Sequence, residues 1–403
     1  MTTAPPTHKQ RALTLEELTA LFQQHLYLPD PAILKLVLAT YVAAKLQRKH
    51  PVWLIVIGAP SGGKTSMFEV LGGLPKVVVA ASVTEAGLLS RRATKDGPVF
   101  SGLLAETGST EGLLVWKDLN SMFQREPREL RKVFAAFGEI YDGHWRRITG
   151  SNATAPIPWS GKLTVLGAAT DGIEEHLPMF AQMGHRFFYY RLPENDEDER
   201  LVLGSVAAQN AQTGARTAEL LKTETQRFLL NLKFDESGMD LEGSALLSLT
   251  LIADLATRCR AHVPTDFRGG VEMILSIEES PRMIAGLTTL IAALVVLGVP
   301  DDEIWSLVLE VALGGIPKVR RSVIDLLAAN PSAEWTISQF GYELRIGEDA
   351  IKRVLNELHA LELIEWTANS TLRASDLLAE RWQQTQAQNL TKVRLTRKQR
   401  GAR

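Results

Sequence analysis

Residues 52–65 read VWLIVIGAPSGGKT and join an apolar run to a glycine-rich loop. The first six residues are apolar and rich in β-branched side chains, which is typical of a strand buried on both faces. The loop fits the pattern G-x-x-x-x-G-K-[ST], and a helical segment follows at residues 67–71. This order of strand, loop and helix predicts a site for the phosphates of a nucleotide.

The backbone of the loop is the physical basis of that prediction. Glycines let successive N–H groups turn toward one point, the following helix directs its positive end there, and Lys64 adds a mobile, solvent-facing cation. Thr65 is the expected magnesium ligand. A chance glycine-rich turn is the alternative. The expected cofactor-binding residues are Gly58, Ala59, Pro60, Ser61, Gly62, Gly63, Lys64, Thr65 and Ser66.

Four more apolar segments predict strands of the same sheet. They lie at residues 76–80, 113–116, 163–168 and 186–191, with helical stretches between several of them. This alternation predicts an α/β fold in which helices cover a parallel sheet. Ahead of the first strand, residues 13–47 show helical periodicity in two pieces, which a proline-containing break at residues 28–31 separates.

The pattern changes beyond an acidic run at residues 194–199, because helical segments replace strands through residue 327. Residues 335–366 then predict two short helices, a turn at 346–347 and a strand, which fits a winged helix-turn-helix. We therefore expect an N-terminal lead (1–28), a nucleotide-binding α/β domain (29–193), a helical lid domain (194–330), a winged helix (331–385) and a basic tail (386–403).

Composition is that of an ordinary globular protein, with 403 residues, 45% hydrophobic and 22% charged. The net charge of -2 gives no overall attraction to nucleic acid. Cys259 is the sole cysteine, which excludes an intrachain disulfide and favours a reducing cytoplasm; we assign it no chemistry. The N-terminus lacks a signal-peptide pattern, and the longest apolar run, 284–299, is shorter than the ~20 residues that span a bilayer.

An acid follows the strand predicted at 113–116. Asp118 would hold magnesium through water beside the phosphate loop. The usual pattern has two adjacent acids, whereas Asp118 is flanked by Lys117 and Leu119. Either Asp118 is the metal-side acid and Glu139 or Asp142 activates water, or Lys117 has replaced the first acid. A plain surface acid is the remaining alternative.

Together these segments resemble the AAA+ ATPases, and within them the minichromosome maintenance helicases and helicase-like proteins of mobile genetic elements. The resemblance covers roughly residues 29–327 and the winged helix. It implies ATP and Mg2+ as cofactors, a homo-oligomer that forms a hexameric ring, DNA and other replication or mobile-element proteins as partners, and no membrane. Its most specific stretches are residues 53–65, 112–120, 137–143, 159–162 and 184–191.

The resemblance also implies roles for single residues. Thr170 matches the polar residue that positions the attacking water, although it could instead cap the turn at 171–172. Arg186 resembles an arginine finger that reaches a neighbouring subunit's γ-phosphate, with a local ion pair as the alternative and Arg191 as the less favoured finger. Arg282, at the start of a helix, resembles the arginine by which the helical domain senses bound nucleotide.

DNA contacts are expected in three places. The resemblance implies that residues 144–162 form a hairpin that tracks DNA, unless it packs on its own subunit. The winged helix offers the segment 348–361, although its acidic residues dilute the positive field and such modules also dock proteins. A basic tail with six Lys or Arg occupies the last twelve residues. The named candidates are Trp145, Arg146, Arg147, Lys162, Lys352 and Arg353.

The sequence therefore favours an ATP hydrolase that moves, unwinds or remodels DNA, in replication of a mobile element. A non-translocating ATPase switch, such as a helicase loader, transposition regulator or defence ATPase, is the first alternative, because the acidic pair is incomplete. A P-loop kinase acting on a small molecule is the second. It is disfavoured because some 200 residues form helical and winged-helix regions.

Overall fold

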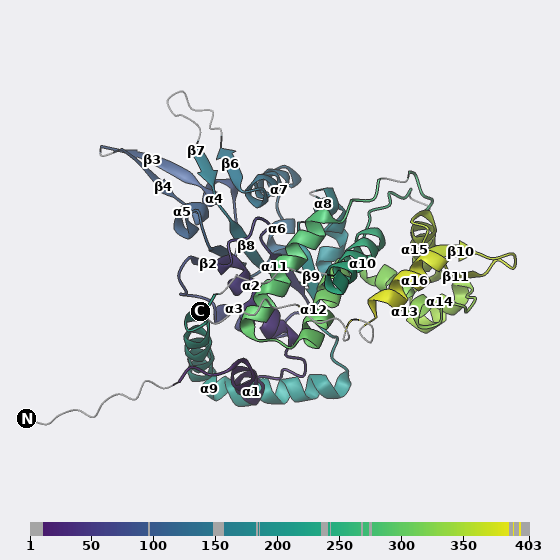
Figure 1. Cartoon of the computed structure of the whole chain (residues 1–403), viewed down its shortest axis with the longest axis horizontal. Helices are drawn as coiled ribbons and strands as arrows, with labels where there is room; N and C mark the ends of the chain where they lie inside the picture. Colours follow the sequence, from purple (N-terminus) through teal and green to yellow (C-terminus); the bar gives the residue numbers. More distant parts are fainter. Residues whose placement is uncertain are drawn as a thin grey trace, which may run out of the picture.

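The computed structural model describes residues 11–95, 97–147, 157–182, 184, 186–234, 241, 243–266, 269–273, 276–386, 390 and 395. Figure 1 shows a sheet wrapped by helices, with a smaller group of helices at the opposite end of the molecule from the two hairpins described below.

A five-stranded parallel sheet forms the centre of the fold, in the order β2-β5-β8-β1-β9. The strands are β1 (Trp53–Ile57), β2 (Val77–Ala80), β5 (Gly112–Trp116), β8 (Leu163–Ala169) and β9 (Phe188–Arg191). All five strands expected from the sequence are confirmed. Since every residue of β1, β5 and β8 is buried, a continuous apolar run was the right signal for them.

Alternate residues of each strand pack on opposite faces of the sheet. On one face Leu54 and Val56 join a core with α2 (Ala32–Lys45), α3 (Lys64–Glu69) and α11 (Pro281–Leu297). On the other face Trp53 and Ile55 join a core with α7 (Pro127–Tyr141). The phosphate loop and α7 therefore belong to opposite faces.

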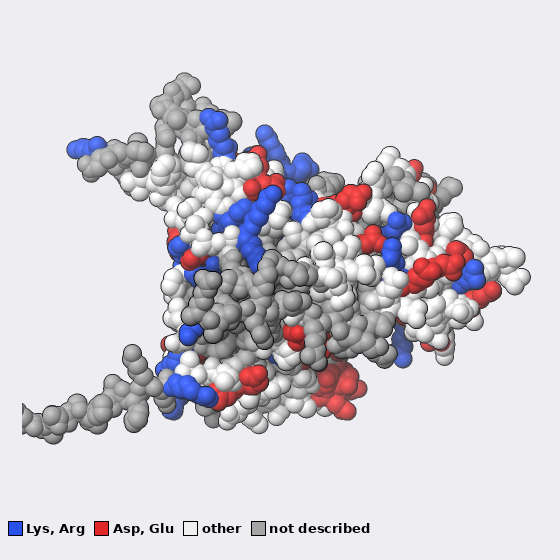
Figure 2. All heavy atoms as spheres, viewed as in Figure 1, with Lys and Arg blue, Asp and Glu red and all other residues white. Residues whose placement is uncertain are grey.

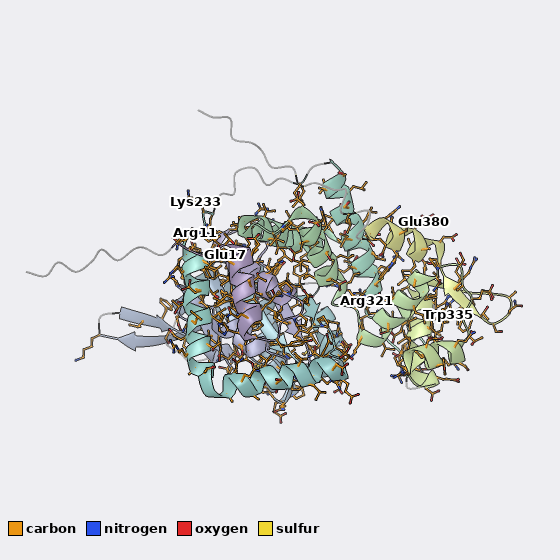
Figure 3. All side chains as sticks on the ribbon, turned by 90° about the horizontal axis from the view of Figure 1, so that it is seen from below. Arg11, Glu17, Lys233, Arg321, Trp335 and Glu380 are labelled. Carbon is orange, nitrogen blue, oxygen red and sulfur yellow. The ribbon has the colours of Figure 1, made fainter. Side chains whose placement is uncertain are left out.

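Two capped helices flank the first of these cores. The helix α1 (Leu15–His25) begins with a capping box between Thr14 and Glu17, and α9 (Glu197–Leu230) begins with one between Asp196 and Glu199. These helices lie side by side (Figures 1 and 3). The acidic run at 194–199 thus starts a helix, and the break expected at residues 28–31 separates α1 from α2.

Two antiparallel hairpins extend from the sheet domain (Figure 1). The hairpin of β6 (His144–Arg147) and β7 (Ile157–Ser160) lies where one was expected. The hairpin of β3 (Ser90–Thr94) and β4 (Gly97–Ser101) was not expected. The short helices of this region are α4 (Glu85–Leu88), α5 (Leu103–Thr107), α6 (Asn120–Phe123), η1 (Asp171–His176) and α8 (Leu177–Gln182).

The rest of the described chain is mainly helical. It comprises α10 (Gly243–Cys259), α12 (Asp301–Leu313), α13 (Lys318–Ala329), α14 (Ile337–Leu344), α15 (Glu348–Ala360), β10 (Ile364–Trp366), β11 (Leu372–Ala374) and α16 (Asp376–Thr385). The strands β10 and β11 form a hairpin, and α13 packs on α14, α15 and β11. Of the helices described, none is long and apolar enough to cross a membrane.

Candidate functional site

The phosphate loop leaves the carboxyl end of β1 and enters α3. Gly58 donates its N–H to Ala169 O at 3.2 Å, which continues the pairing of β1 with β8. A side chain at Gly58 would come within 2.8 Å of Leu192, so the close approach requires glycine. Gly63 caps α3 at a φ of 78°, in the left-handed region that glycine adopts without strain. The local backbone thus explains two glycines of the motif.

Lys64 is buried, with 8% of its surface exposed, which corrects the expectation of a mobile, solvent-facing ammonium. Its Nζ donates to the carbonyl oxygens of Gly58 and Ala59, both at 2.7 Å. Burial lowers the pKa of Lys64, whereas the carboxylates of Asp171 and Asp118 act in the opposite direction. The loop's own carbonyls therefore hold the cation that a phosphate would attract.

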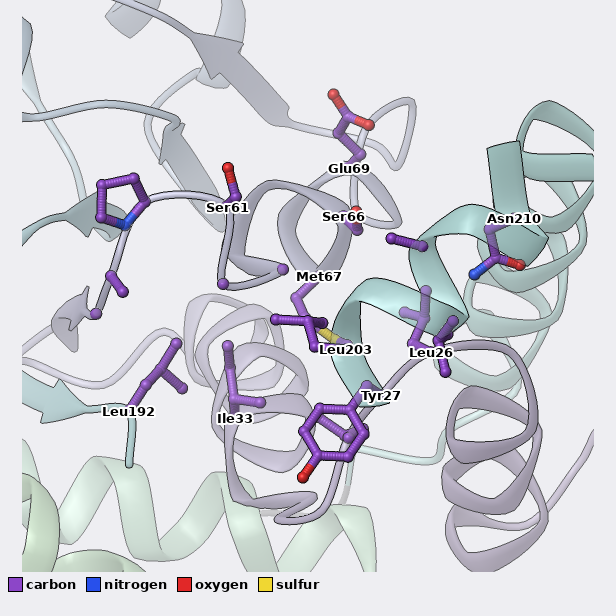
Figure 4. A pocket seen from close by; sticks show the side chains of 18 of the residues that line it. Leu26, Tyr27, Ile33, Ser61, Ser66, Met67, Glu69, Leu192, Leu203 and Asn210 are labelled. Carbon is purple, nitrogen blue, oxygen red and sulfur yellow. The ribbon is translucent and has the colours of Figure 1, made fainter. Parts of the chain in front are cut away.

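A cavity of about 1280 Å³ opens between the phosphate loop and α9. Ser61 and Ser66 line it from the loop and α3, whereas Leu26 comes from the segment after α1 and Leu203 and Asn210 come from α9 (Figure 4). Its volume exceeds the range of about 300–1,000 Å³ that is usual for small-molecule sites. The space is therefore large enough for a nucleoside triphosphate.

The ends of β5 and β8 meet beside the loop. The Asp118 Oδ1 accepts the N–H of Asn120 at 2.9 Å. The Asn120 side chain in turn donates to the Thr170 hydroxyl and accepts the Thr170 N–H at 3.3 Å. Thr170 does stand before the η1 turn, but its side chain makes no capping bond there. Sequence reasoning missed Asn120, although its place two residues after Asp118 was an available signal.

The donor set suits magnesium only when a nucleotide completes it. Thr65 and Asp118 are exposed and offer a hydroxyl and a carboxylate oxygen, the hard ligands that Mg2+ prefers. Among the described residues no group of three or more His, Cys, Asp or Glu could hold a metal. Magnesium commonly binds through one or two carboxylates plus substrate phosphates, so the residues fit such a site. Lys117 precedes Asp118, and its Nζ lies 2.8 Å from Glu69 Oε1.

Arg186 lies near the amino ends of the strands, whereas the phosphate loop lies at their carboxyl ends. Phe188 pairs with Leu54 in parallel register, so Arg186 stands about six residues, or roughly 20 Å along the strands, from Gly58. Its Nη2 contacts Asp142 Oδ2 at 2.9 Å, and its guanidinium lies over the ring of Tyr141. Burial raises the pKa of Tyr141 to about 12. The residue thus has the local ion pair given as an alternative, and it cannot reach its own phosphate loop.

Two further candidates, Arg282 and Glu139, do not line the cavity. Arg282 pairs with Glu278 and packs against Gly184. Glu139 lies on the exposed side of α7, one turn before Asp142. Arg191 does line the cavity, but its guanidinium is bonded to Glu174 and to the carbonyls of Gly314 and Ile316.

The hairpin candidates for DNA divide into buried and exposed residues. Trp145 is 6% exposed and pairs across the hairpin with Trp159, so its ring belongs to the core, contrary to the expected stacking. Arg146 is exposed, and Lys162 donates to the Lys49 carbonyl at 2.8 Å. The side chain of Arg147 and residues 148–156 lie outside the described residues. On the face in Figure 2, Lys and Arg atoms gather in the upper half.

Lys352 and Arg353 are exposed on α15. This helix also contacts the loop before α11, because Asn356 Nδ2 donates to Gly269 O at 3.0 Å. Glu357 pairs with the buried Arg320 of α13 at 2.7 Å. The basic residues of the tail lie outside the part of the chain that the structure describes.

Comparison with known proteins gives a likeness of structure, without a match of sequence. No protein-family model matches the chain, and no curated protein matches it. Its structure is similar to the crystal structure of a full-length MCM homolog from Methanopyrus kandleri, with 15% sequence identity and a TM-score of 0.45. The match covers 75% of this chain and 59% of that one, so this chain spans less than two thirds of that protein's length.

Proposed function

We propose that this protein binds ATP with Mg2+ at the phosphate loop and hydrolyses it. The observation that carries the proposal is that three candidate segments follow the carboxyl ends of neighbouring parallel strands. The loop follows β1, Asp118 follows β5 and Thr170 follows β8. Ligands of open parallel sheets bind at the carboxyl ends of the strands, and the cavity lies there.

Each residue has a distinct task in this proposal. The loop's N–H groups and Lys64 bind the phosphates, with Lys64 exchanging its two carbonyl partners for phosphate oxygens. Thr65 and Asp118 would hold Mg2+, which neutralises charge on the phosphates when bound. Thr170, oriented by Asn120, positions the attacking water.

We further propose that the chain works as an AAA+ oligomer, as a ring, and acts on DNA as a helicase in replication of a mobile element. Two features support this. Arg186 and Arg282 both lie near Tyr141, at the amino ends of the strands and away from the phosphate loop, where they are placed to serve a neighbouring subunit. The order α13, α14, α15, β10 and β11 is that of a winged helix, with Lys352 and Arg353 exposed.

A non-translocating ATPase switch is the second candidate. The observation that favours it is Lys117, a cation beside Asp118 where a second acid would support hydrolysis. A switch needs nucleotide binding and assembly more than fast turnover. Stimulation of hydrolysis by single-stranded DNA together with strand unwinding distinguishes the helicase from the switch.

Lys64→Ala tests the phosphate site itself. Loss of the ammonium should weaken binding of a non-hydrolysable ATP analogue at least about tenfold, a loss of about 1.4 kcal/mol. Calorimetric titration measures this, and circular dichroism checks the fold, since Lys64 is buried. Lys132→Ala is the matched control, because Lys132 makes an exposed ion pair on α7. Equal affinity in both variants and wild type would remove the phosphate-loop assignment.

A further inference from the structure

Lys117 faces the phosphate-binding side of the sheet. Along β5, Leu113 and Val115 pack with Met67 and Phe68 of α3, whereas Leu114 and Trp116 pack in the core that contains α7. The Lys117 N–H donates to Ala80 O at 2.9 Å, so the strand pairing continues through this residue. Alternation therefore directs Lys117 toward α3.

The ammonium group lies at the wall of the cavity. Lys117 and Glu69 both line it, together with Gly62, Gly63 and Ser66 of the loop and α3. Figure 4 shows Glu69 and Ser66 on α3, at the cavity. The Lys117 Nζ stands 2.8 Å from Glu69 Oε1, with 34% and 53% of the two side chains exposed. A pair this exposed is weakly held, so a polyphosphate can compete with Glu69 for the cation.

Positive charge at this point changes what the site requires of a metal ion. A bound triphosphate needs cations near its β- and γ-oxygens, and magnesium ordinarily supplies much of that charge. Here Lys64 and Lys117 approach from the loop and the strand, and Lys318 also lines the cavity, paired with Asp171 and Glu194. An ammonium is a compact point charge with three donors, which suits phosphate oxygens.

We propose that Lys117 binds nucleotide phosphates in place of part of the metal, so that the site holds a nucleoside polyphosphate with little dependence on a divalent cation. The inference rests on the proposed nucleotide-binding function. In this account Glu69 is the internal partner that holds Lys117 until phosphate replaces it. Thr65 and Asp118 still provide oxygen ligands when Mg2+ is present.

Calorimetric titration of the full chain with ADP and with a non-hydrolysable ATP analogue, in Mg2+ and in EDTA, tests this. Wild-type affinity should fall less than about tenfold in EDTA, and Lys117→Ala should lose at least a further tenfold there, about 1.4 kcal/mol. Lys117→Arg should retain metal-free binding, Lys117→Asp should abolish it, and Glu69→Gln should strengthen it by freeing the cation. Lys132→Ala, which removes a comparable exposed pair, should match wild type.

The outcomes separate this inference from the proposed function. Wild-type binding that requires Mg2+, with Lys117→Ala indistinguishable from it, would overturn the role of Lys117 and leave the nucleotide site standing. An absence of binding by wild type under both conditions would overturn the two together. Because binding is measured without turnover, slow hydrolysis affects neither result.

Discussion

Asn120 shows how one uncharged side chain can order the site. Its backbone N–H binds Asp118, and its amide group bonds reciprocally to Thr170, so it couples the ends of β5 and β8. Asn120→Ala should lower kcat about tenfold to a hundredfold with little change in nucleotide affinity, because misplacing a positioning group costs rate. Steady-state kinetics and calorimetry separate the two quantities.

Asn356→Ala is the control for Asn120, since it removes an amide that bonds to Gly269, in a loop remote in sequence from the site. A parallel loss of affinity and kcat at Asn120 would instead indicate local unfolding. The sequence predicted Lys64 from the phosphate-loop motif and Asp118 from its place after a strand, but it could not reveal this link, because Asn120 and Thr170 are fifty residues apart. The burial of Lys64 could not be predicted from the motif either, since it depends on the hydrogen bonds from its Nζ to the carbonyls of Gly58 and Ala59.

At the scale of elements, the buried strands were predictable and the polar hairpin was not. Every residue of β1, β5 and β8 is buried, so their apolar runs stand out from the flanking loops. The hairpin of β3 (SRRAT) and β4 (GPVFS) has only two adjacent large apolar residues, Val99 and Phe100, and both are exposed, so no long apolar run marks it. The helix α13 packs with α14 and α15, a contact that local sequence does not specify.

Arg320 of α13 is a buried link in that contact. Its side chain is 4% exposed, pairs with Glu357 of α15, and donates to the carbonyls of Cys259 and Ala261. Arg320→Ala should lower the free energy of unfolding by about 3–5 kcal/mol, because it leaves a largely buried carboxylate unpaired. Denaturant titration followed by tryptophan fluorescence measures this loss.

Arg373→Ala is the matched control. Arg373 is exposed and pairs with Glu365 across the hairpin of β10 and β11, so its removal should cost less than about 1 kcal/mol. Equal losses in the two variants would show that Arg320 is no more than a surface ion pair. A loss confined to the first of two unfolding transitions would assign the link to one part of the chain.

At the scale of the whole molecule, the functional candidates lie at opposite ends of the parallel strands. The phosphate loop, Asp118 and Thr170 lie at the carboxyl ends, whereas Arg186 and Arg282 lie at the amino ends. The sequence shows the order of the motifs along the chain. Which end of the sheet each motif occupies depends on the direction and register of the strands. Within one chain these two sets of groups do not meet; the proposed oligomer is expected to bring them together.

Mixing complementary variants tests that expectation. Arg186→Ala should still bind nucleotide, because Arg186 lies about 20 Å along the strands from Gly58. It should hydrolyse poorly if the guanidinium completes a neighbour's site, since an arginine finger contributes roughly 10³ to 10⁵ in rate. Lys64→Ala subunits bring the arginine without a working loop, so combining the two variants should restore part of the activity where an intact arginine meets an intact loop.

Two controls make the mixing result decisive. Asp142→Asn removes the ion pair of Arg186 but keeps the guanidinium, so it should hydrolyse far better than Arg186→Ala if the arginine acts on a neighbour. Mixing Lys64→Ala with the double variant Lys64→Ala/Arg186→Ala should restore nothing, because no subunit then has an intact loop. Mass measurement confirms that the variants assemble together. If they do and no mixing ratio recovers activity, Arg186 serves its own chain, as the partner of Asp142 and Tyr141.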